Sequence, residues 1–328
     1  MTSPAPLGAG ALPEDLVGYM RATRVERLKT GSVIDDCLGG GLPAGVTLLG
    51  GMPNSGKSTL LADTAMRAAT QRGMRVLYVT NDDPKHAVVA HCAAAWCNLP
   101  EQVRAGGARF PWSKLDERLD AELAELLRPD PLDGSVMDPS RAAYEAARRP
   151  GSVAAALNAF SAACGGRLEV RDDFATTLEL VAALEEARAR GAAPDLVILD
   201  YFQQMQSGDP NADRDEMSRA EAASEHLRAW GAATGGHAIV VSRVRKSSAK
   251  SDGDPTLADF AGNSKLAYDA QAAIILRKNP ALDGSAANGS AYEAIEAYTV
   301  KSKVGRAGAM TQYKLFGGAS TTRRWDAK

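Results

Sequence analysis

Cysteines and aromatic residues are both scarce in this chain of 328 residues. The four cysteines, Cys37, Cys92, Cys97 and Cys164, form no CxxC pair. Sparse, unpaired cysteines are typical of a reducing compartment and exclude a domain held together by disulfides, so we expect a cytoplasmic protein. Aromatic residues make up 5% of the chain, which disfavours a surface of aromatic side chains that stack on bases.

Long apolar segments are missing as well. No apolar run approaches the roughly 18 residues that a membrane-spanning helix needs, and the N-terminal sequence MTSPAPLGAGALPEDL has neither the basic segment nor the apolar core of a secretory signal. The sequence therefore predicts no membrane association. Hydrophobic residues at 45% and charged residues at 24% exclude a disordered, collagen-like or coiled-coil protein.

Charge is nearly balanced over the whole chain but is distributed unevenly. The net charge of −2 disfavours a uniformly basic nucleic-acid-binding protein. From residue 240 onward there are 14 Lys/Arg against 8 Asp/Glu, whereas the preceding part carries 24 against 32. The basic C-terminal third would contact phosphate while the remainder stays solvated.

Apolar segments alternate with helical patterns along most of the chain. Strands are predicted at 46–50, 75–80, 168–170, 195–200, 238–241, 272–276, 294–300 and 311–316, and helices at 57–72, 85–97, 176–190 and 216–234. Nearly continuous apolar strands that alternate with helices are typical of a parallel sheet covered on both faces. Because loops join the last strands, we expect an α/β fold whose mostly parallel central sheet has antiparallel strands at its C-terminal edge.

Two segments are expected to lie outside this core. Residues 1–27 combine a tail rich in Pro, Gly and Ala with a short amphipathic helix after Pro13. The stretch 112–152 is polar and is interrupted by prolines, which predicts helical pieces and a loop inserted between two strands. Residues 28–328 would then form one domain that carries this insertion.

The clearest motif is a phosphate-binding loop. The segment GMPNSGKST (residues 51–59, the P-loop) matches GxxxxGK[ST], follows a predicted strand and opens a predicted helix. Backbone N–H groups of such a loop and the helix N-terminus bind a triphosphate. Lys57 would contact the β- and γ-phosphates of ATP, and the hydroxyl of Ser58 would bind Mg²⁺. The residues predicted to bind nucleotide are Gly51, Pro53, Asn54, Ser55, Gly56, Lys57, Ser58 and Thr59.

Carboxylates follow two of the predicted strands. Asp200 ends the apolar strand DLVILD, and we expect it to be the second metal ligand because open α/β sheets bind ligands at the carboxyl ends of their strands. Asp82 and Asp83 follow the strand RVLYVT and are candidates for the base that orients the attacking water. A solvated turn after the strand is the alternative for this pair. Nucleotide hydrolysis is therefore the predicted chemistry.

A zinc site is not predicted. His86, His91, Cys92 and Cys97 lie close in sequence but lack the short ligand spacing of zinc knuckles. A partly buried helix accounts for these residues.

These motifs, in this order, resemble the helicase core of the DnaB family, a branch of the RecA-like ATPases. The resemblance extends from about residue 28 to residue 325 and is strongest in TGSVIDDCLGGGLPAG before the P-loop, in VTNDDP, in DYFQQM (200–205) and in 256–306. DYFQQM is close to the Asp-Tyr-Leu-Gln-Leu-hydrophobic string of the family's metal-binding strand. The resemblance implies a hexameric ring that hydrolyses ATP at subunit interfaces and moves single-stranded DNA through its centre, with replication initiator or loader proteins as further partners.

The resemblance also assigns roles to residues around the nucleotide. Asp82 takes the position of the family's catalytic Glu, with Asp83 beside it. Ser242 takes the position of the serine in the family's sensor segment Ser-Gln-Leu-Asn-Arg, and Arg243 replaces the expected Gln.

Three cations near the C-terminus take the family's interfacial position. Lys301 and Lys303 match the Lys-x-Arg pair that reaches into the neighbouring subunit's site, and Arg306 is the alternative to Lys303. A lysine cannot form the planar, two-pronged contact of an arginine with a transferring phosphoryl group. We therefore expect slow or partner-dependent turnover.

The family's DNA-contacting loop Asp-Leu-Arg-Glu-Ser-Gly corresponds here to DFAGNSK (259–265), which lacks the arginine. Backbone N–H groups and polar side chains of this loop would contact phosphate, and the neighbouring basic run would add salt-sensitive binding without sequence preference. A solvated face is the alternative. The residues predicted to contact nucleic acid are Arg243, Arg245, Lys246, Lys250, Asn263 and Lys265.

The sequence leaves two other functions open. One is a regulatory or recombination ATPase similar to KaiC or RadA, in which hydrolysis switches assembly; Arg243 and Lys303, which replace the family's usual residues, favour it. The other is a nucleotide-binding loader or scaffold subunit, which would bind ATP with negligible turnover.

Overall fold

A single sheet of ten strands organises the chain in the computed structural model, which describes residues 16–18, 26–107, 109–131, 133–245, 253–260, 264–286 and 290–325. The strands are β1 (Gly45–Gly51), β2 (Val76–Thr80), β3 (Leu168–Arg171), β4 (Leu196–Asp200), β5 (His237–Ser242), β6 (Ala272–Lys278), β7 (Gly284–Ser285), β8 (Ala291–Ser302), β9 (Ala309–Phe316) and β10 (Thr321–Arg324). Their order is β10-β9-β8-β6-β1-β5-β4-β2-β3, and β7 pairs with β8.

The direction of the strands changes at β6. Strands β6, β1, β5, β4, β2 and β3 are parallel to one another, whereas β8, β9 and β10 add in antiparallel order beyond β6. The loops after β8 and β9 are too short to hold the crossover helix that parallel neighbours require. The predicted α/β fold with a mostly parallel sheet and an antiparallel C-terminal edge is confirmed.

Helices cover both faces of this sheet. They are α2 (Val33–Cys37), α3 (Lys57–Gln71), α4 (Lys85–Cys97), α5 (Pro100–Arg104), α6 (Leu115–Leu126), α7 (Pro139–Ala146), α8 (Val153–Cys164), α9 (Thr177–Ala189), α10 (Glu216–Thr234) and α11 (Ser264–Asp269). Leu49 and Tyr78 pack with α3, α4 and α8, and their neighbours Leu48 and Val79 pack with α9, α10 and α11. Successive strand residues point to opposite faces, so the apolar strands are buried on both sides.

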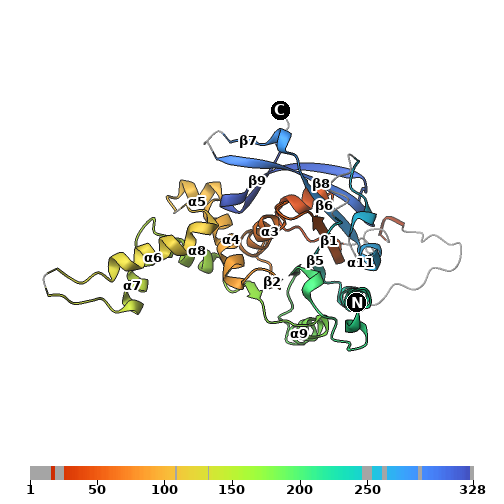
Figure 1. Cartoon of the computed structure of the whole chain (residues 1–328), viewed down its shortest axis with the longest axis horizontal. Coiled ribbons are helices and arrows are strands. Elements are labelled where there is room, and N and C mark those ends of the chain that lie inside the picture. The colour runs from red at the N-terminus through yellow and green to blue at the C-terminus, as the bar shows by residue number, and fades with distance from the viewer. Residues whose placement is uncertain are drawn as a thin grey trace.

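The segment between β2 and β3 extends away from the sheet. Helices α6 and α7 lie at one end of the molecule's long axis, beyond α8 (Figure 1). Glu122 of α6 accepts hydrogen bonds from the backbone N–H groups of Val153 (2.7 Å) and Ala154 (3.2 Å), the first residues of α8. A carboxylate at a helix N-terminus satisfies donors that have no partner within the helix, so Glu122 anchors α6 to α8.

The sequence patterns do not predict α2, α5, α8, α11, β7 or β10. Helix α8 is an alanine-rich segment that ends at Gly165 in the left-handed conformation (φ 54°). Strand β10 contains two threonines and two arginines, so pairing with β9, and not an apolar pattern, determines it. Of the predicted helix after Pro13, residues 16–18 are described and helical, and most of the remainder lies outside the described residues. No described helix has the length and apolar character that crossing a membrane requires.

Helix α10 approaches β1 through two glycines. A Cβ atom placed on Gly231 would lie 2.9 Å from the Cα of Gly45, which is closer than such atoms pack. The backbone of β1 cannot shift freely because β5 and β6 flank it on both sides. The small residue at 231 therefore sets the distance between the helix and the strand that leads to the P-loop.

We expect Gly231→Ala to lower the free energy of unfolding by about 1–2 kcal/mol, because the added methyl group overpacks this contact. Helix propensity alone predicts the opposite sign, since alanine in a helix interior is favoured over glycine by about 1 kcal/mol. Urea unfolding followed by circular dichroism measures the change. A Gly231→Ala protein that is more stable than the parent would contradict the close approach.

Candidate functional site

The P-loop joins the end of β1 to the start of α3 and requires backbone conformations that favour glycine. Asn54 and Gly56 have φ angles of 62° and 86°, and a Cβ on Gly56 would collide with the side chain of Leu315 on β9. No side chain caps the N-terminus of α3 at Gly56. Ser55 is buried, and its Oγ has no hydrogen-bond partner among the described residues. The loop therefore offers uncapped N–H groups and an unpartnered hydroxyl, as a phosphate-binding loop does.

Lys57 lies folded over this loop. Its Nζ donates hydrogen bonds to the carbonyl oxygens of Gly51 (3.0 Å) and Met52 (2.9 Å). Burial lowers the pKa of Lys57, and the carboxylates of Asp200 and Asp82 oppose that shift. The ammonium is thus positioned beside both the loop and the carboxylates at the same edge of the sheet.

Asp200 ends β4 directly beside the end of β2. Thr80 and Asp200 are paired in the register of the two strands, so Asp82 and Asp83, which follow β2, lie next to Asp200. The Asp200 side chain is 6% exposed, and its Oδ2 accepts a hydrogen bond from the hydroxyl of Tyr78 (2.9 Å). Burial, with a contribution from Asp83, raises the pKa of Asp200 to about 6, against the opposing effects of Tyr78 and Lys57.

Asp82 and Asp83 have different environments. Burial and the neighbouring Asp82 raise the pKa of Asp83. Asp82 is exposed and accepts a hydrogen bond at Oδ1 from Nε2 of Gln204 (3.2 Å). Asp82 is therefore the carboxylate at this edge that is both accessible and held by a neighbouring side chain.

A chain of contacts connects Asp82 to the basic segment after β5. Nε2 of Gln204 also donates to the hydroxyl of Tyr201 (2.9 Å). The guanidinium of Arg243 lies 4.6 Å from the centroid of the Tyr201 ring and donates to its hydroxyl. We call Asp82, Gln204, Tyr201 and Arg243 the acid-to-arginine chain. These contacts fix the position of Arg243, although the DnaB family has glutamine at this position.

Sequence reasoning missed the side chains that support the site. It used DYFQQM as a family signature without a role for Tyr201, Gln203 or Gln204. Gln203 donates through Nε2 to Oγ of Ser242 (2.8 Å), the buried residue that ends β5. The available signal was the pair of amide side chains three and four residues after the expected metal ligand, because such polar residues near a strand end need partners when they are partly buried.

The structure places only some of the predicted nucleic-acid contacts. The N–H of Arg245 donates to the carbonyl of Asp259 (2.8 Å), and Val244 pairs with Phe260, so the basic segment after β5 lies beside the loop around 256–260. Lys265 is exposed on α11. The predicted contacts Lys246, Lys250 and Asn263 lie outside the described residues.

The three C-terminal cations, Lys301, Lys303 and Arg306, lie away from the P-loop of their own chain. The end of β8 pairs Lys301 with Ala273, near the start of β6, whereas Gly51 pairs with Leu276 farther along β6. Three strand residues correspond to about 10 Å, and the P-loop lies beyond Gly51. The C-terminal cations therefore lie at the end of the sheet where β6 begins, and the P-loop lies at the opposite end, where β1 ends.

Two of these cations instead contact the end of α11. Nζ of Lys301 donates to the carbonyl oxygens of Ala267 (3.0 Å) and Tyr268, and Nζ of Lys303 lies 3.5 Å from the carbonyl oxygen of Asp269. Ammonium groups at a helix C-terminus satisfy carbonyls that have no partner within the helix. Arg306 is exposed in the loop between β8 and β9.

The residues present fit a magnesium ion held together with a nucleotide. Among the described residues, no group of three or more His, Cys, Asp or Glu side chains could hold a metal ion. Magnesium in nucleotide enzymes is bound through one or two protein oxygens plus phosphates and water, so the hydroxyl of Ser58 and the carboxylate of Asp200 suffice.

All four cysteines are buried.

The chain is similar to several known proteins. A family model described as an AAA domain matches residues 25–249. The DNA repair protein RadA of Mycobacterium tuberculosis, in strains CDC 1551 / Oshkosh and H37Rv, is 45% identical over 77 residues, which are 23% of this chain and 15% of RadA. The matched stretch thus spans a small part of RadA.

Two solved structures share the fold over most of the chain. The ATPase domain of G40P has a TM-score of 0.69 at 11% identity and is matched over 97% of this chain and 100% of that domain. A DnaB-like replicative helicase, described with its interactions with primase, has a TM-score of 0.68 at 11% identity over 96% of this chain and 69% of that one. The predicted RecA-like core and its resemblance to the DnaB family are confirmed in the fold.

Asp200→Asn should stabilise the folded chain above pH 6. The folded protein binds the Asp200 proton more tightly than the unfolded chain, so ionisation opposes folding as the pH rises from the ordinary pKa of 3.8 to about 6. An asparagine removes this cost, which is on the order of 3 kcal/mol, and still accepts the Tyr78 hydrogen bond.

Urea unfolding of the parent and of Asp200→Asn between pH 4 and pH 8 measures this difference. The gain should fall to a small fraction of its value near pH 4, where the Asp200 carboxyl is protonated in the folded chain and only about half ionised in the unfolded chain. Asp195→Asn, at the start of the same strand, is the control. If the difference in unfolding free energy between Asp200→Asn and the parent is the same at every pH, the surroundings of Asp200 do not disfavour its charged form.

Proposed function

The chain belongs to the AAA domain family, and we propose on this premise that it is an ATP-dependent motor on single-stranded DNA. In this proposal it acts as a DnaB-like helicase or translocase in replication or repair and works as a ring of identical subunits. The observation that carries the proposal is the separation of the P-loop from the C-terminal cations at opposite edges of one sheet.

The edge that carries the P-loop has the groups that ATP hydrolysis needs. The loop N–H groups and Lys57 would bind the phosphates, and Ser58 and Asp200 would hold Mg²⁺, which neutralises phosphate charge when bound. Asp82 would accept the hydrogen bond of the attacking water, because it is accessible and is oriented by Gln204. Asp83 is the second candidate for this role, since burial and the neighbouring Asp82 raise its pKa toward the operating pH.

The position of the C-terminal cations supports a ring. They cannot reach the P-loop of their own chain, but in a head-to-tail arrangement the cation edge of one copy faces the P-loop edge of the next. Such an interface repeats around a closed ring, and six copies follow from the resemblance to DnaB-like helicases. Lys301, Lys303 and Arg306 would then stabilise the transferring phosphoryl group of the neighbour.

Contacts of the same cations support a link between hydrolysis and DNA. Lys301 and Lys303 hold the carbonyl end of α11, and α11 begins within the segment that we propose contacts DNA (259–265). When these lysines turn toward the neighbour's phosphates, α11 loses the hydrogen bonds that fix its end. On the P-loop side, the acid-to-arginine chain joins Asp82 to Arg243 in the proposed DNA-contacting segment.

A repair or recombination ATPase that assembles on DNA without unwinding it is the second candidate. The local identity with RadA favours it, as does Arg243 at the position where the DnaB family has glutamine. Both candidates use single-stranded DNA and identical subunits as partners. A replication initiator or loader protein is a further partner only of the helicase.

For the motor, we expect ATPase activity to rise at least several-fold with oligo-dT and the apparent DNA affinity to fall steeply with salt. Arg245→Gln should weaken DNA binding and reduce the slope of log affinity against log salt by about 1. Lys57→Ala should abolish turnover. The measurements are coupled-enzyme ATPase rates, fluorescence anisotropy and strand separation of a forked duplex.

The outcomes separate the candidates. DNA-stimulated turnover with strand separation supports the helicase, and DNA-stimulated turnover with filament formation alone supports the second candidate. ATP binding with negligible turnover under all conditions would refute both and leave a loader or scaffold subunit.

Mixing two inactive variants tests the shared interface. Lys57→Ala removes the P-loop function, and the triple variant Lys301→Ala, Lys303→Ala, Arg306→Ala removes the cations. In randomly mixed rings, about a quarter of interfaces combine an intact P-loop with intact cations from the next copy, so mixing should restore up to about that share of activity. Native mass spectrometry confirms that mixed oligomers form. Mixed rings without any recovered activity would contradict action between copies.

A further inference from the structure

A cavity lies along α3, away from the P-loop. It has a volume of about 860 Å³ and is lined by residues of α3, the start of α2, the start of α5 and strands β7, β8, β9 and β10. No residue of the P-loop lines it. Arg67 on α3 faces it ten residues after Lys57, which corresponds to about 15 Å along the helix axis. A ligand in this cavity is therefore distinct from a nucleotide at the P-loop.

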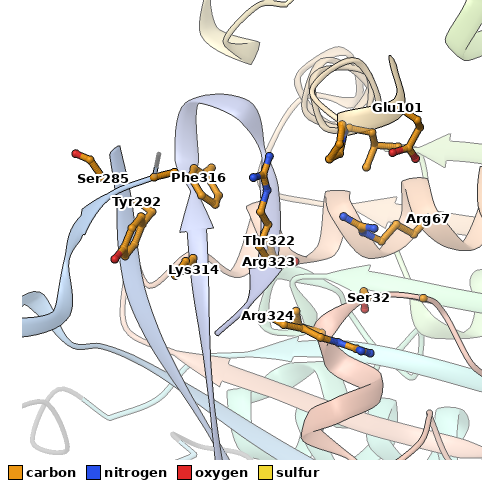
Figure 2. Close-up of a pocket in the computed structure, with 15 residues that line it drawn as sticks. Ser32, Arg67, Glu101, Ser285, Tyr292, Lys314, Phe316, Thr322, Arg323 and Arg324 are labelled. Atoms are coloured by element: carbon orange, nitrogen blue, oxygen red, sulfur yellow. The ribbon is translucent and has the colours of Figure 1, made fainter. Parts of the chain in front are cut away.

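Cationic side chains outnumber acidic ones in the lining of this cavity. Arg67, Lys314, Arg323 and Arg324 are the cationic side chains, and Glu101 is the one acidic side chain among the described residues that line it. Figure 2 shows Arg67 from α3 and Arg323 and Arg324 from β10 around the same space. We call this site the arginine cavity.

Arg67 and Arg324 form ion pairs through Nε, which leaves their terminal amino groups available to a ligand. Asp63 contacts Arg67 through Nε (3.0 Å), and Asp36 contacts Arg324 through Nε (2.6 Å). The terminal amino groups of Arg67 and Arg324 form no hydrogen bond within the part of the chain that the structure describes. The Arg67 side chain is 19% exposed, so its contacts with an anion would be only weakly screened by water.

The other two cations are held in place by aromatic rings. The guanidinium of Arg323 lies 4.9 Å from the centroid of the Phe316 ring. The ammonium of Lys314 lies 5.3 Å from the ring centroids of both Tyr292 and Trp325. Stacking of this kind reduces the freedom of long side chains, so the Arg323 guanidinium is held at the cavity before an anion binds.

We propose that the arginine cavity binds the phosphate groups of a second ligand, separate from the nucleotide at the P-loop. Planar guanidinium groups from α3 and β10 match the oxygens of a phosphate monoester, a polyphosphate or a phosphodiester. The phosphates belong either to a small polyphosphate or to the backbone of a nucleic-acid strand. The proposal goes beyond the motor function and does not require ATP hydrolysis.

The test uses inorganic tripolyphosphate and fluorescein-labelled oligo-dT as probes, in a Lys57→Ala background that removes binding at the P-loop. Arg323→Gln with Arg324→Gln should weaken binding of at least one probe by about tenfold, because two charge-assisted contacts are lost. Arg188→Gln with Arg190→Gln, exposed arginines of α9 and its end, is the control and should leave both affinities unchanged. Calorimetry and anisotropy measure the two probes.

The two probes distinguish the sources of phosphate. Loss of tripolyphosphate binding identifies a small polyphosphate ligand, and loss of oligo-dT binding alone identifies a nucleic-acid strand; either supports the site. Unchanged affinity for both probes, or an equal loss in the Arg188 and Arg190 control, overturns it.

A second variant separates binding from misfolding. Glu101→Gln removes the lining carboxylate and should tighten binding of the affected probe about threefold. An unfolded or damaged protein cannot produce tighter binding. Unchanged or weaker binding by Glu101→Gln would refute an anion site at this position.

Discussion

The charge balance around Lys57 is the constraint on which the candidate site depends. A partly buried ammonium and three carboxylates share the edge of the sheet where β1, β2 and β4 end. Burial disfavours the charged form of Lys57 and of Asp200, and each group partly offsets the penalty of the other. Tyr78 adds a hydrogen bond to Asp200, and the loop carbonyls hold Lys57. A phosphate-binding loop is thereby kept in place at the cost of stability at neutral pH.

The order and direction of the strands place the two sets of candidate functional residues at opposite ends of the sheet. The parallel strands place the P-loop, Asp82 and Asp200 at one edge, and the reversal at β8 returns Lys301 to the other edge. In the proposed ring, repetition of the subunit would bring the P-loop of one copy to the C-terminal cations of the next. The close contact of Gly231 with Gly45 fixes α10 against the strand between these edges.

Much of the fold and the chemical centre of the site could be predicted from the sequence. The P-loop is a local motif, because its glycine, lysine and serine act at fixed spacing between a strand and a helix. The apolar segments at 75–80 and 195–200 identified buried strands, since residues buried on both faces leave a continuous pattern. The resemblance to the DnaB family identified the fold, and the matches to G40P and the DnaB-like helicase confirmed it.

Other features depend on pairing between distant segments, which no local pattern encodes. β10 is a strand because β9 lies beside it, and its arginines line the same cavity as Arg67 only through that pairing. Gln204 donates a hydrogen bond to Asp82, 122 positions earlier in the chain, because β2 and β4 are neighbours. The sequence by itself determined which side chains can bind phosphate or carry charge, since those properties belong to single residues and short motifs. Only the tertiary structure decided which of them share an edge, because strand order follows from packing over the whole chain.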